Sequence, residues 1–460
     1  MRRRVHIVGI GGTGLSAIAR VLHERGERVT GSDQAVTSYS RALEALGIPV
    51  HYGHAAENVV GADVVLVSSA VAEDNPEVAA ARRNGIRVVR RQGFLGELTE
   101  GLRVVAVAGT HGKTTTSSLI AWTLVQAGMK PGFILGGVPH DLGTNAQAGA
   151  GAEFVIEADE YDYAFLGLTP QFAIVTNVEH DHPDVFPTPA DVRAAFQQFV
   201  DRVQDRLLVC IEDPVARELG REGLHRQTYG FDEAADWRAE EVRPNNTGGM
   251  DFLAVHAREV LGLFRTRLPG RHNVLNALAA VAAADWLGLS MAVVRQALTD
   301  FRGVGRRFEV VGEVGQVVAI DDYAHHPSEV RATLEAARQR YPGHSIWAVF
   351  QPHTYSRTRA LADEFAQAFS GADHVVVTEV FAARERPDPA AGGRVLAERI
   401  LQPDVHFASD LEEAAAYIVG RLASPAVVVT LSAGDANVVG RRVLEMISAG
   451  GKERGRDERA

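Results

Sequence analysis

Cysteine is almost absent from this chain of 460 residues, because Cys210 is the single example. One cysteine cannot form an intramolecular disulfide, which excludes a disulfide-stapled secreted scaffold and indicates a reducing compartment. Lysine is also scarce, since only Lys113, Lys130 and Lys452 occur among the 47 basic residues. Each lysine is therefore conspicuous, and Lys113 lies in a glycine-rich turn.

Long apolar runs and an excess of positive charge are missing as well. No segment approaches the roughly 18 consecutive apolar residues of a membrane span. The N-terminal MRRRVHIVGIGG begins with arginines as a signal peptide does, but glycines interrupt its apolar core too early for one. The net charge of −11 argues against a general nucleic-acid-binding protein. We therefore expect a cytoplasmic protein that neither binds nucleic acid nor inserts into a membrane.

The patterning predicts three α/β domains in series. Hydrophobic residues make up 46% of the chain and charged residues 23%, as in ordinary globular proteins. Three consecutive blocks alternate short apolar runs with helical patterns, which is typical of parallel sheets covered by helices. We expect domains at residues 1–99, 100–304 and 305–450, and a disordered polar tail at 451–460. The helices expected in these blocks include residues 15–25, 38–46, 76–84, 114–127, 273–287, 329–338 and 360–368.

The first motif is the glycine-rich segment GIGGTG at residues 9–14, between an apolar strand pattern and a helical one. Asp33 follows at the end of the next expected strand. Glycines in this context let the backbone approach a diphosphate at a helix N-terminus. The motif indicates a diphosphate joined to a ribose, which NAD or a UDP-sugar supplies. A tight turn without a ligand is the alternative.

The second motif is GTHGKT at residues 109–114, which we call the phosphate loop. It also follows a buried-looking strand and precedes a helix. Backbone amides would hold phosphates, Lys113 would reach the β- and γ-phosphate oxygens, and Thr114 would bind Mg²⁺. The segment departs from the common eight-residue pattern, because Val107 stands where a glycine is expected.

Two acidic segments offer metal ligands. In VIEADEYD a strand ends in carboxylates, and Glu157 or Asp159 could bind Mg²⁺ opposite the phosphate loop. The segment TNVEHDHPDVF contains His180, Asp181, His182 and Asp184. This density suggests metal or phosphate chemistry, with a zinc site and a hydrated polar loop as the alternatives.

The remaining polar segments lie at the beginning of a helix and at strand ends. RHNVLNALAA places Asn273 and Asn276 on one helix face, where they could read an adenine edge or simply cap the helix. GVGRRFEVVG, IDDYAHHPSEV and QPHTYSRTR could hold anionic substrates and a nucleotide ribose. Arg357 and Arg359 could bind a carboxylate by paired hydrogen bonds, and ordinary surface charge is the alternative.

Together these segments resemble the Mur ligase family. HIVGIGGTGLS, SSAV, AGTHGKTTT, EADEYD, TNVEHDHPD, RHNVLNA, GVGRRFE, DDYAHHPSEV and QPHTYSRTR occur in the family's order over nearly the whole chain. The resemblance implies a Rossmann-like N-terminal domain, a central domain like a P-loop ATPase, and a Rossmann-like C-terminal domain. It implies a ligase that uses ATP and two Mg²⁺ ions to join UDP-N-acetylmuramate to L-alanine through an acyl phosphate in peptidoglycan precursor synthesis. It is compatible with a monomer or a homodimer.

The resemblance also implies roles for individual residues. The UDP-sugar would contact Gly11, Gly12, Thr13, Gly14, Asp33 and Ser69. ATP would contact Gly109, Thr110, His111, Gly112, Lys113, Thr114, Thr115, Asn273, Asn276, Arg307 and Asp322. Thr114 and Glu157 would hold one Mg²⁺ and His182 the other, and the amino acid would be bound by Tyr323, His325, His353 and Arg357. The residues expected to act in catalysis are Lys113, Glu157, His182, Arg307 and His325, with His325 as the base.

Two features of the sequence refine this resemblance. Thr354 stands where some relatives carry arginine, which places more of the carboxylate recognition on Arg357. No lysine occurs at residues 183–230, where several sister enzymes carry a carbamylated lysine and the alanine-adding branch does not. Three other functions are kept open: a tripeptide-recycling ligase of the same family, a nicotinamide dehydrogenase that uses the first glycine motif, and a nucleotide switch or motor.

Overall fold

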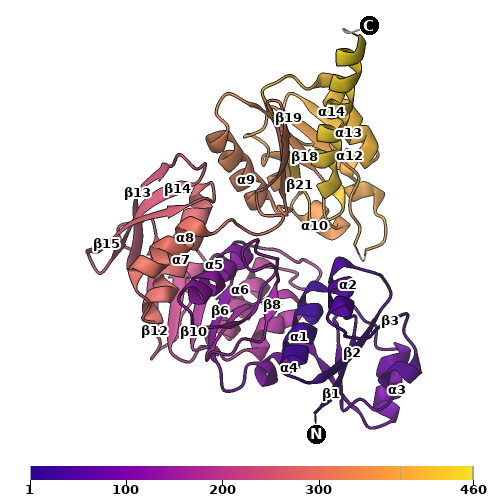
Figure 1. Ribbon diagram of the computed structural model, residues 1–460, viewed down its shortest axis with the longest axis vertical. Helices are drawn as coiled ribbons and strands as arrows, with labels where there is room; N and C mark the ends of the chain where they lie inside the picture. Colours follow the sequence, from indigo (N-terminus) through magenta and orange to yellow (C-terminus); the bar gives the residue numbers. More distant parts are fainter. Residues whose placement is uncertain (1, 384, 458–460) are drawn as a thin grey trace.

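The computed structural model describes residues 2–383 and 385–457, with side chains described up to residue 449. It contains three β-sheets, one after another along the chain, and each sheet lies within one of the three expected domain ranges (Figure 1). The boundaries expected at residues 99 and 304 stay predictions. None of the helices in the described part of the chain is long and apolar enough to cross a membrane.

The N-terminal domain is a parallel sheet in the order β3-β2-β1-β4-β5 with helices packed on it. Its elements are β1 (Arg4–Val8), α1 (Thr13–Glu24), β2 (Arg28–Asp33), α2 (Ser38–Ala45), β3 (Val50–Tyr52), the 3₁₀-helix η1 (Ala56–Val59), β4 (Val64–Val67), α3 (Pro76–Arg83), β5 (Arg87–Arg90) and α4 (Arg91–Leu98). The winding direction reverses between β1 and β4, and ligands of open α/β sheets bind at such a point, beyond the carboxyl ends of the strands. The GIGGTG segment follows β1 and therefore lies there.

The central domain has ten strands in the order β15-β14-β13-β12-β11-β10-β6-β9-β7-β8. Its strands are β6 (Arg103–Ala108), β7 (Gly132–Ile134), β8 (Ala146–Gln147), β9 (Glu153–Glu157), β10 (Phe172–Val175), β11 (Arg206–Cys210), β12 (His225–Gly230), β13 (Trp237–Pro244), β14 (Met250–His256) and β15 (Glu259–Thr266). Its helices are α5 (Lys113–Gln126), η2 (Tyr161–Gly167), α6 (Pro189–Val200), η3 (Ala216–Glu218), α7 (Arg271–Trp286) and α8 (Met291–Asp300). Because β6 lies between β10 and β9, the phosphate loop meets the ends of both neighbours.

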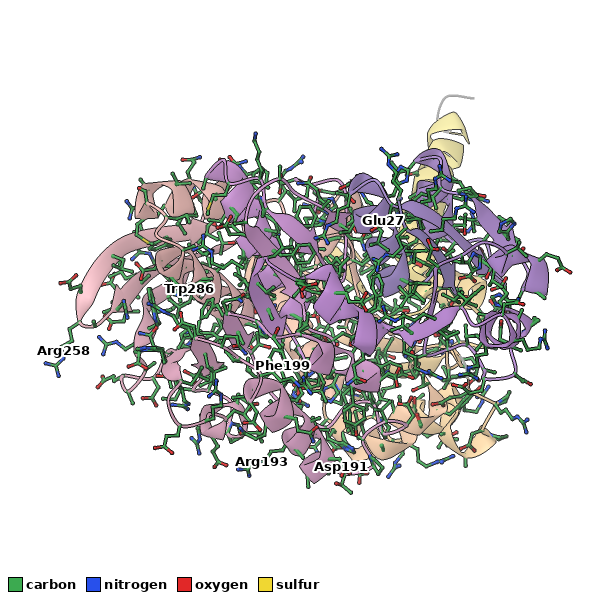
Figure 2. The ribbon with its side chains drawn as sticks, turned by 90° about the horizontal axis from the view of Figure 1, so that it is seen from below. Glu27, Asp191, Arg193, Phe199, Arg258 and Trp286 are labelled. Carbon is green, nitrogen blue, oxygen red and sulfur yellow. The ribbon has the colours of Figure 1, made fainter. Side chains whose placement is uncertain are left out.

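In the central domain the parallel part of the sheet is buried, whereas its antiparallel end lies at the periphery. Phe199 of α6 lies inside the domain in Figure 2 and stacks on Phe165 with ring centroids 5.0 Å apart. Arg258 lies at the tip of the hairpin between β14 and β15 and extends outward (Figure 2). The antiparallel end is therefore peripheral, and the buried parallel strands carry the phosphate loop.

The C-terminal domain has six strands in the order β16-β17-β21-β18-β19-β20. Its strands are β16 (Glu309–Val314), β17 (Val317–Asp322), β18 (Ser345–Phe350), β19 (His374–Val377), β20 (Val405–Phe407) and β21 (Ala426–Leu431). Its helices are α9 (Pro327–Arg340), α10 (Tyr355–Ala360), α11 (Ala362–Ala366), η4 (Pro389–Ala391), α12 (Gly393–Ala397), α13 (Leu411–Arg421), η5 (Ala436–Val438) and α14 (Val439–Asp457). Figure 1 shows α10 on the side of this domain that faces the rest of the molecule.

One helix expected from the sequence is shorter in the structure. Within residues 360–368 the helix α11 covers Ala362–Ala366, and Leu361, with φ −111° and ψ 21°, separates it from the preceding helix α10. A disordered tail is expected at residues 451–460, for which the structure describes no side chains. The backbone of α14 is helical to Asp457, residues 458–460 are outside the described residues, and disorder of the tail stays a prediction.

A buried carboxylate of the N-terminal domain binds side chains from the strands of the sheet and from the segments between them. Glu77 of α3 has no exposed surface and accepts hydrogen bonds from Ser32 Oγ and Asn58 Nδ2. The imidazole nitrogens His6 Nε2 and His54 Nδ1 lie 3.5 Å and 3.4 Å from Glu77 Oε2. Burial by itself raises the pKa of Glu77, but His6, Ser32 and Asn58 outweigh burial and lower the pKa to about 2.

We expect the substitution Glu77→Gln to destabilise the N-terminal domain more at pH 7 than at pH 3. The pKa of the folded state, about 2, is below the ordinary value of 4.5, so the carboxylate stabilises the domain above pH 4.5. This stabilisation is lost as the pH falls toward 2. The loss in the free energy of unfolding at pH 7 should be about 3 kcal/mol, measured by denaturant unfolding at both pH values.

The control for this prediction is Glu73→Gln. Glu73 pairs with Arg82 and Arg90, but its side chain is 60% exposed, so its removal should change stability little. An equal loss for Glu77→Gln at pH 7 and pH 3 would contradict the prediction.

Candidate active site

A cavity of about 230 Å³ lies between the central and C-terminal domains. Most of the residues predicted to bind ATP line it: His111, Gly112, Thr114, Thr115, Asn273, Asn276, Arg307 and Asp322. Gly109, Thr110 and Lys113 belong to the same loop, next to the cavity. Cys210, Tyr229, Leu268 and Leu275 give the cavity a less polar part. The cavity thus has a polar region at the phosphate loop and an apolar region beside α7.

The phosphate loop contains two glycines that no other residue could replace without a shift of the backbone. Gly109 has φ +137°, and a Cβ there would lie 1.9 Å from Thr176 Oγ1. Gly112 has φ +81°, and a Cβ there would lie 2.6 Å from Asn276 Oδ1. The loop therefore packs tightly between the end of β10 and the helix α7.

Lys113 lies under this loop as a charged group. Its ammonium donates hydrogen bonds to the carbonyl oxygens of Gly109 and Thr110, and it lies 2.9 Å from Glu160 Oε2. Burial by itself lowers the pKa of Lys113, but Glu160, Glu157 and Asp159 outweigh it and raise the pKa. Glu160 lies in the EADEYD motif, but the sequence analysis did not single it out.

The residues expected to hold the first Mg²⁺ fit that role. Glu157 ends β9 and pairs in register with Val107 of β6. Its Oε2 accepts a hydrogen bond of 2.7 Å from the backbone of Gly136, and a Cβ on the adjacent Gly137 would lie 3.3 Å from Thr114 Cγ2. One turn thus contacts both predicted ligands, and carboxylate and hydroxyl oxygens suit Mg²⁺.

The other candidate ligands are divided among different partners. Asp159 forms an ion pair of 2.7 Å with Arg91, so of the two carboxylates predicted as Mg²⁺ ligands Glu157 is the one without an ion pair to an arginine in the described part of the chain. His182 Nε2 lies 3.8 Å from Glu160 Oε1, the carboxylate that also pairs with Lys113. Among the described residues, His180, Asp181, His182 and Asp184 do not converge on one point as metal donors. A zinc site built from this segment alone is therefore not formed.

The residues predicted to bind the amino acid come together from two segments of the C-terminal domain. The rings of His325 and His353 are 5.8 Å apart, and those of Tyr323 and His325 are 5.4 Å apart. Arg357 Nη1 donates a hydrogen bond of 3.0 Å to His353 Nδ1. Arg359, the other arginine considered, is 63% exposed and pairs with Asp388, so Arg357 alone belongs to this group.

Arg357 also forms a buried ion pair across the domain interface. Its Nε lies 2.7 Å from Oδ1 of Asp181 in the central domain, and the side chains are 4% and 7% exposed. Burial by itself raises the pKa of Asp181, but Arg357 and His182 outweigh it and lower the pKa well below its usual range. Both groups of the pair are therefore charged.

His325 has a defined tautomer. Its Nδ1 lies 2.8 Å from the carbonyl oxygen of Tyr323. A carbonyl only accepts, so Nδ1 carries the hydrogen and Nε2 carries the lone pair. Burial lowers the pKa of His325 to about 3. His325 is therefore neutral at physiological pH, with an acceptor nitrogen available.

Glu329 is a central residue of the site that the sequence analysis missed. Its Oε1 lies 3.2 Å from His111 Nδ1 and 3.5 Å from Arg307 Nη1. It thereby connects the phosphate loop with the first strand–helix unit of the C-terminal domain. A signal was present in HHPSE, because Pro327 is the first residue of the helix and Glu329 forms a capping box with the N-cap residue His326. Nothing in that local pattern indicates that the carboxylate faces another domain.

The predicted ribose ligand Asp322 lies in the same cavity. Its carboxylate accepts hydrogen bonds from the backbone amides of Phe308 and Ala324, each 2.8 Å long. Burial raises the pKa of Asp322 to about 6 despite the nearby Arg307. The side chain is thus fixed by the backbone at the wall of the cavity.

The predicted UDP-sugar residues surround the N-terminus of α1. The amide of Gly11 donates a hydrogen bond of 2.8 Å to Asp33 Oδ2, Gly12 is the N-cap of α1, and Thr13 is its first residue. A Cβ on Gly14 would lie 3.1 Å from the guanidinium of Arg91. Ser69 is exposed after β4.

Arg91 is a second residue that the sequence analysis missed. It begins α4, lies over the GIGGTG segment and pairs with Asp159 of the central domain. No local pattern distinguishes it from the many other arginines. Its position makes it a candidate ligand for a diphosphate at α1.

The site agrees with comparisons to known proteins. Three family models match consecutive parts of the chain: "Mur ligase family, catalytic domain" at residues 4–103, "Mur ligase middle domain" at 107–284 and "Mur ligase, glutamate ligase domain" at 306–434. The UDP-N-acetylmuramate–L-alanine ligase of Roseiflexus castenholzii is 45% identical over 95% of this chain and 96% of its own length.

Solved structures give the same result. The UDP-N-acetylmuramate-alanine ligase of Thermotoga maritima has a TM-score of 0.81 and 30% identity, and the match covers 97% of this chain and 99% of that one. The murein peptide ligase of Psychrobacter arcticus has a TM-score of 0.70 and 27% identity over 96% and 98% of the two chains. With its three matching domains and a phosphate loop that faces the C-terminal domain, the chain belongs to the Mur ligase family.

Proposed function

We propose that this chain forms the amide bond between the lactyl carboxylate of UDP-N-acetylmuramate and the amine of L-alanine, in peptidoglycan precursor synthesis, with hydrolysis of ATP to ADP and phosphate. The observation that carries the proposal is that relatives named for this activity match over nearly the whole length of both chains. The site supports it, because phosphate-binding and carboxylate-binding groups face one interface. We place the reaction in the cytoplasm, with a monomer or a homodimer as the active form.

The chemistry explains why ATP is required. A carboxylate is a poor acyl donor because its leaving group would be oxide. Transfer of the γ-phosphoryl group to the carboxylate gives an acyl phosphate and ADP. Attack by the neutral amine then forms the amide and releases phosphate, and one proton passes from the amine to a base. Lys113 and Arg307 would stabilise the negative charge on the phosphoryl oxygens as they move.

Two kinds of group would assist this transfer. Mg²⁺ bound at Thr114 and Glu157, and a second ion at His182, would offset phosphate charge and orient the oxygens. The guanidinium of Arg357 would bind the carboxylate of L-alanine, and Nε2 of His325 would accept the proton that the attacking amine loses as the amide forms. Closure of the C-terminal domain over the central domain would exclude water, which would otherwise hydrolyse the acyl phosphate.

The nearest alternative is a ligase that attaches a whole peptide. It would use the same phosphate loop and the same UDP-sugar. The solved alanine ligase matches with a TM-score of 0.81, against 0.70 for the solved murein peptide ligase at similar coverage, and the listed curated relatives are named for the alanine ligase, which favours the single amino acid. A dehydrogenase or a nucleotide switch would leave the interdomain residues without a role.

The test is phosphate release from ATP in the presence of Mg²⁺ and UDP-N-acetylmuramate. L-alanine, glycine, L-serine and the recycled tripeptide are added separately. We expect release that requires both the UDP-sugar and L-alanine. Release driven only by the tripeptide would move the chain to the peptide-recycling branch, and an equal rate without any acceptor would refute the ligase proposal.

We expect Arg357→Lys to raise the KM for L-alanine about 10- to 100-fold, because lysine lacks the two-pronged geometry that pairs with a carboxylate. The KM for ATP should change much less. The control is Arg359→Lys, two residues further on at an exposed position, which should leave both constants unchanged. Steady-state kinetics with each substrate varied in turn would measure these effects. An increase limited to the KM for ATP would place Arg357 elsewhere in the site.

We expect His325→Gln to lower kcat about 100-fold, within the range that general base catalysis contributes, with little change in the KM for ATP. Since the pKa of His325 is about 3 in the free enzyme, this imidazole stays neutral from pH 5 to pH 9. His325 should therefore add no inflection to the pH profile of kcat/KM in that range. Any inflection that the wild type shows there should persist in the variant. Wild-type kcat in His325→Gln would assign the base to another group.

A further inference from the structure

Outside the predicted Mg²⁺ ligands, three side chains converge at the interface between the central and C-terminal domains. His111 belongs to the phosphate loop, Glu179 follows β10, and His326 precedes α9. One donor atom from each of the three lies within 4.8 Å of the other two. The rings of His111 and His326 are 4.6 Å apart. We call this group the interdomain triad.

The distances suit a transition-metal ion. Zn²⁺ binds imidazole nitrogen at about 2.0–2.1 Å and carboxylate oxygen at about 2.0–2.2 Å, so donors around one ion lie roughly 3–4 Å apart. Glu179 Oε2 lies 3.7 Å from His111 Nε2 and 3.5 Å from His326 Nδ1. Because all three donor atoms lie within 4.8 Å of one another, small shifts bring them to one ion.

The triad also has unused bonding capacity. His326 is 4% exposed, yet its Nε2 has no hydrogen-bond partner, and neither has Nε2 of the partly buried His111. His326 Nδ1 accepts only a long bond of 3.3 Å from the amide of Ser328, which a metal ion would replace. Buried polar atoms without partners are unfavourable, and an ion bound to His111 Nε2 would remove that penalty for this atom. His326 would bind the ion through Nδ1, so its Nε2 is not part of this argument.

The charge of the surroundings favours a dication. Glu179 and Glu329 are both ionised, since the pKa of Glu179 is lowered to about 2 and that of Glu329 well below its usual range, in both cases by His111 against the effect of burial. His326 faces the same pair of carboxylates as a neutral ring, because burial lowers its pKa to about 4. Arg307 is the other cation at Glu329. A metal ion that replaced the proton of His111 would neutralise both carboxylates.

We propose that His111, Glu179 and His326 form a binding site for Zn²⁺ or a similar transition-metal dication, separate from the Mg²⁺ sites. Two imidazoles and one carboxylate are a donor set that selects such ions over Mg²⁺. Since His111 and Glu179 line the ATP cavity, a bound ion occupies the approach to the phosphate loop. If the proposed ligase function holds, Zn²⁺ inhibits the enzyme in competition with MgATP.

The test uses the full chain without nucleotide or substrate. Co²⁺ replaces Zn²⁺ as a spectroscopic probe, and its visible absorption reports a site with nitrogen ligands and low coordination number. We expect one Co²⁺ per chain, displaced by Zn²⁺ and not by millimolar Mg²⁺. Zn²⁺ should also raise the melting temperature, because it binds residues of two domains in the folded state only.

Variants locate the ion. Glu179→Gln and His326→Asn should each lower the affinity for Co²⁺ at least tenfold, and asparagine preserves the ability to cap α9. The matched control is His180→Asn, next to Glu179, whose ring bonds the carbonyl oxygen of Phe186 instead; it should bind Co²⁺ normally. Absence of Co²⁺ binding, or undiminished binding in both triad variants, overturns the proposal. Loss of binding in His182→Gln instead would place the ion at the second Mg²⁺ site. All of these measurements are independent of whether the chain ligates L-alanine.

Discussion

The interface between the central and C-terminal domains depends on one constraint, which is that buried charges must be paired. Arg357 pairs with Asp181 and Glu329 with His111 across the interface. Beside it, Lys113 pairs with Glu160 within the central domain and Arg307 with Glu329 within the C-terminal domain. Removing one partner of a buried pair leaves an uncompensated charge, which is far more costly than losing an exposed pair. The two domains can therefore meet in this arrangement only while each of these cations has an anion beside it.

The sheets explain why these charges meet at all. Parallel strands bring their carboxyl ends to one edge, so β6, β9 and β10 deliver the phosphate loop, Glu157 and Thr176 to the same place. The C-terminal domain brings Asp322 at the end of β17 and Glu329 in the first turn of α9. Each domain thus presents the chemically active edge of its own sheet to the other. The geometry of the site follows from the arrangement of these two edges.

The sequence predicted the parts of the site that depend on local chain geometry. The phosphate loop could be identified because strand, glycine turn and helix are adjacent in the chain, and its glycines have the positive φ that the pattern requires. In the C-terminal domain β17, β18, β19 and β21 coincide with apolar runs of the sequence, whereas β16 and β20 were not predicted. The helix expected at residues 360–368 is shorter in the structure, because no local signal marks the break at Leu361.

What the sequence could not provide is the pairing between distant segments. Asp181 and Arg357 are separated by 176 positions, and neither segment indicates that these two residues pair with each other. Glu329 could be recognised only as part of a capping box, and Arg91 only as one of many arginines. The roles of Tyr323, His325 and His353 came from family resemblance, and they stay predictions even though the structure brings the three rings together.

The same pairing rule connects substrate binding with catalysis. Carboxylates of the protein lie beside the cations that the proposed reaction would use, with Glu160 at Lys113 and Glu329 at Arg307. Phosphate oxygens that reached Lys113 and Arg307 would compete with these carboxylates, and the excess negative charge would repel the nucleotide. A divalent cation that entered with the phosphates would offset this excess. In the proposed reaction, Mg²⁺ held by Thr114 and Glu157 beside the loop would therefore serve the binding of ATP as well as the transfer of the phosphoryl group.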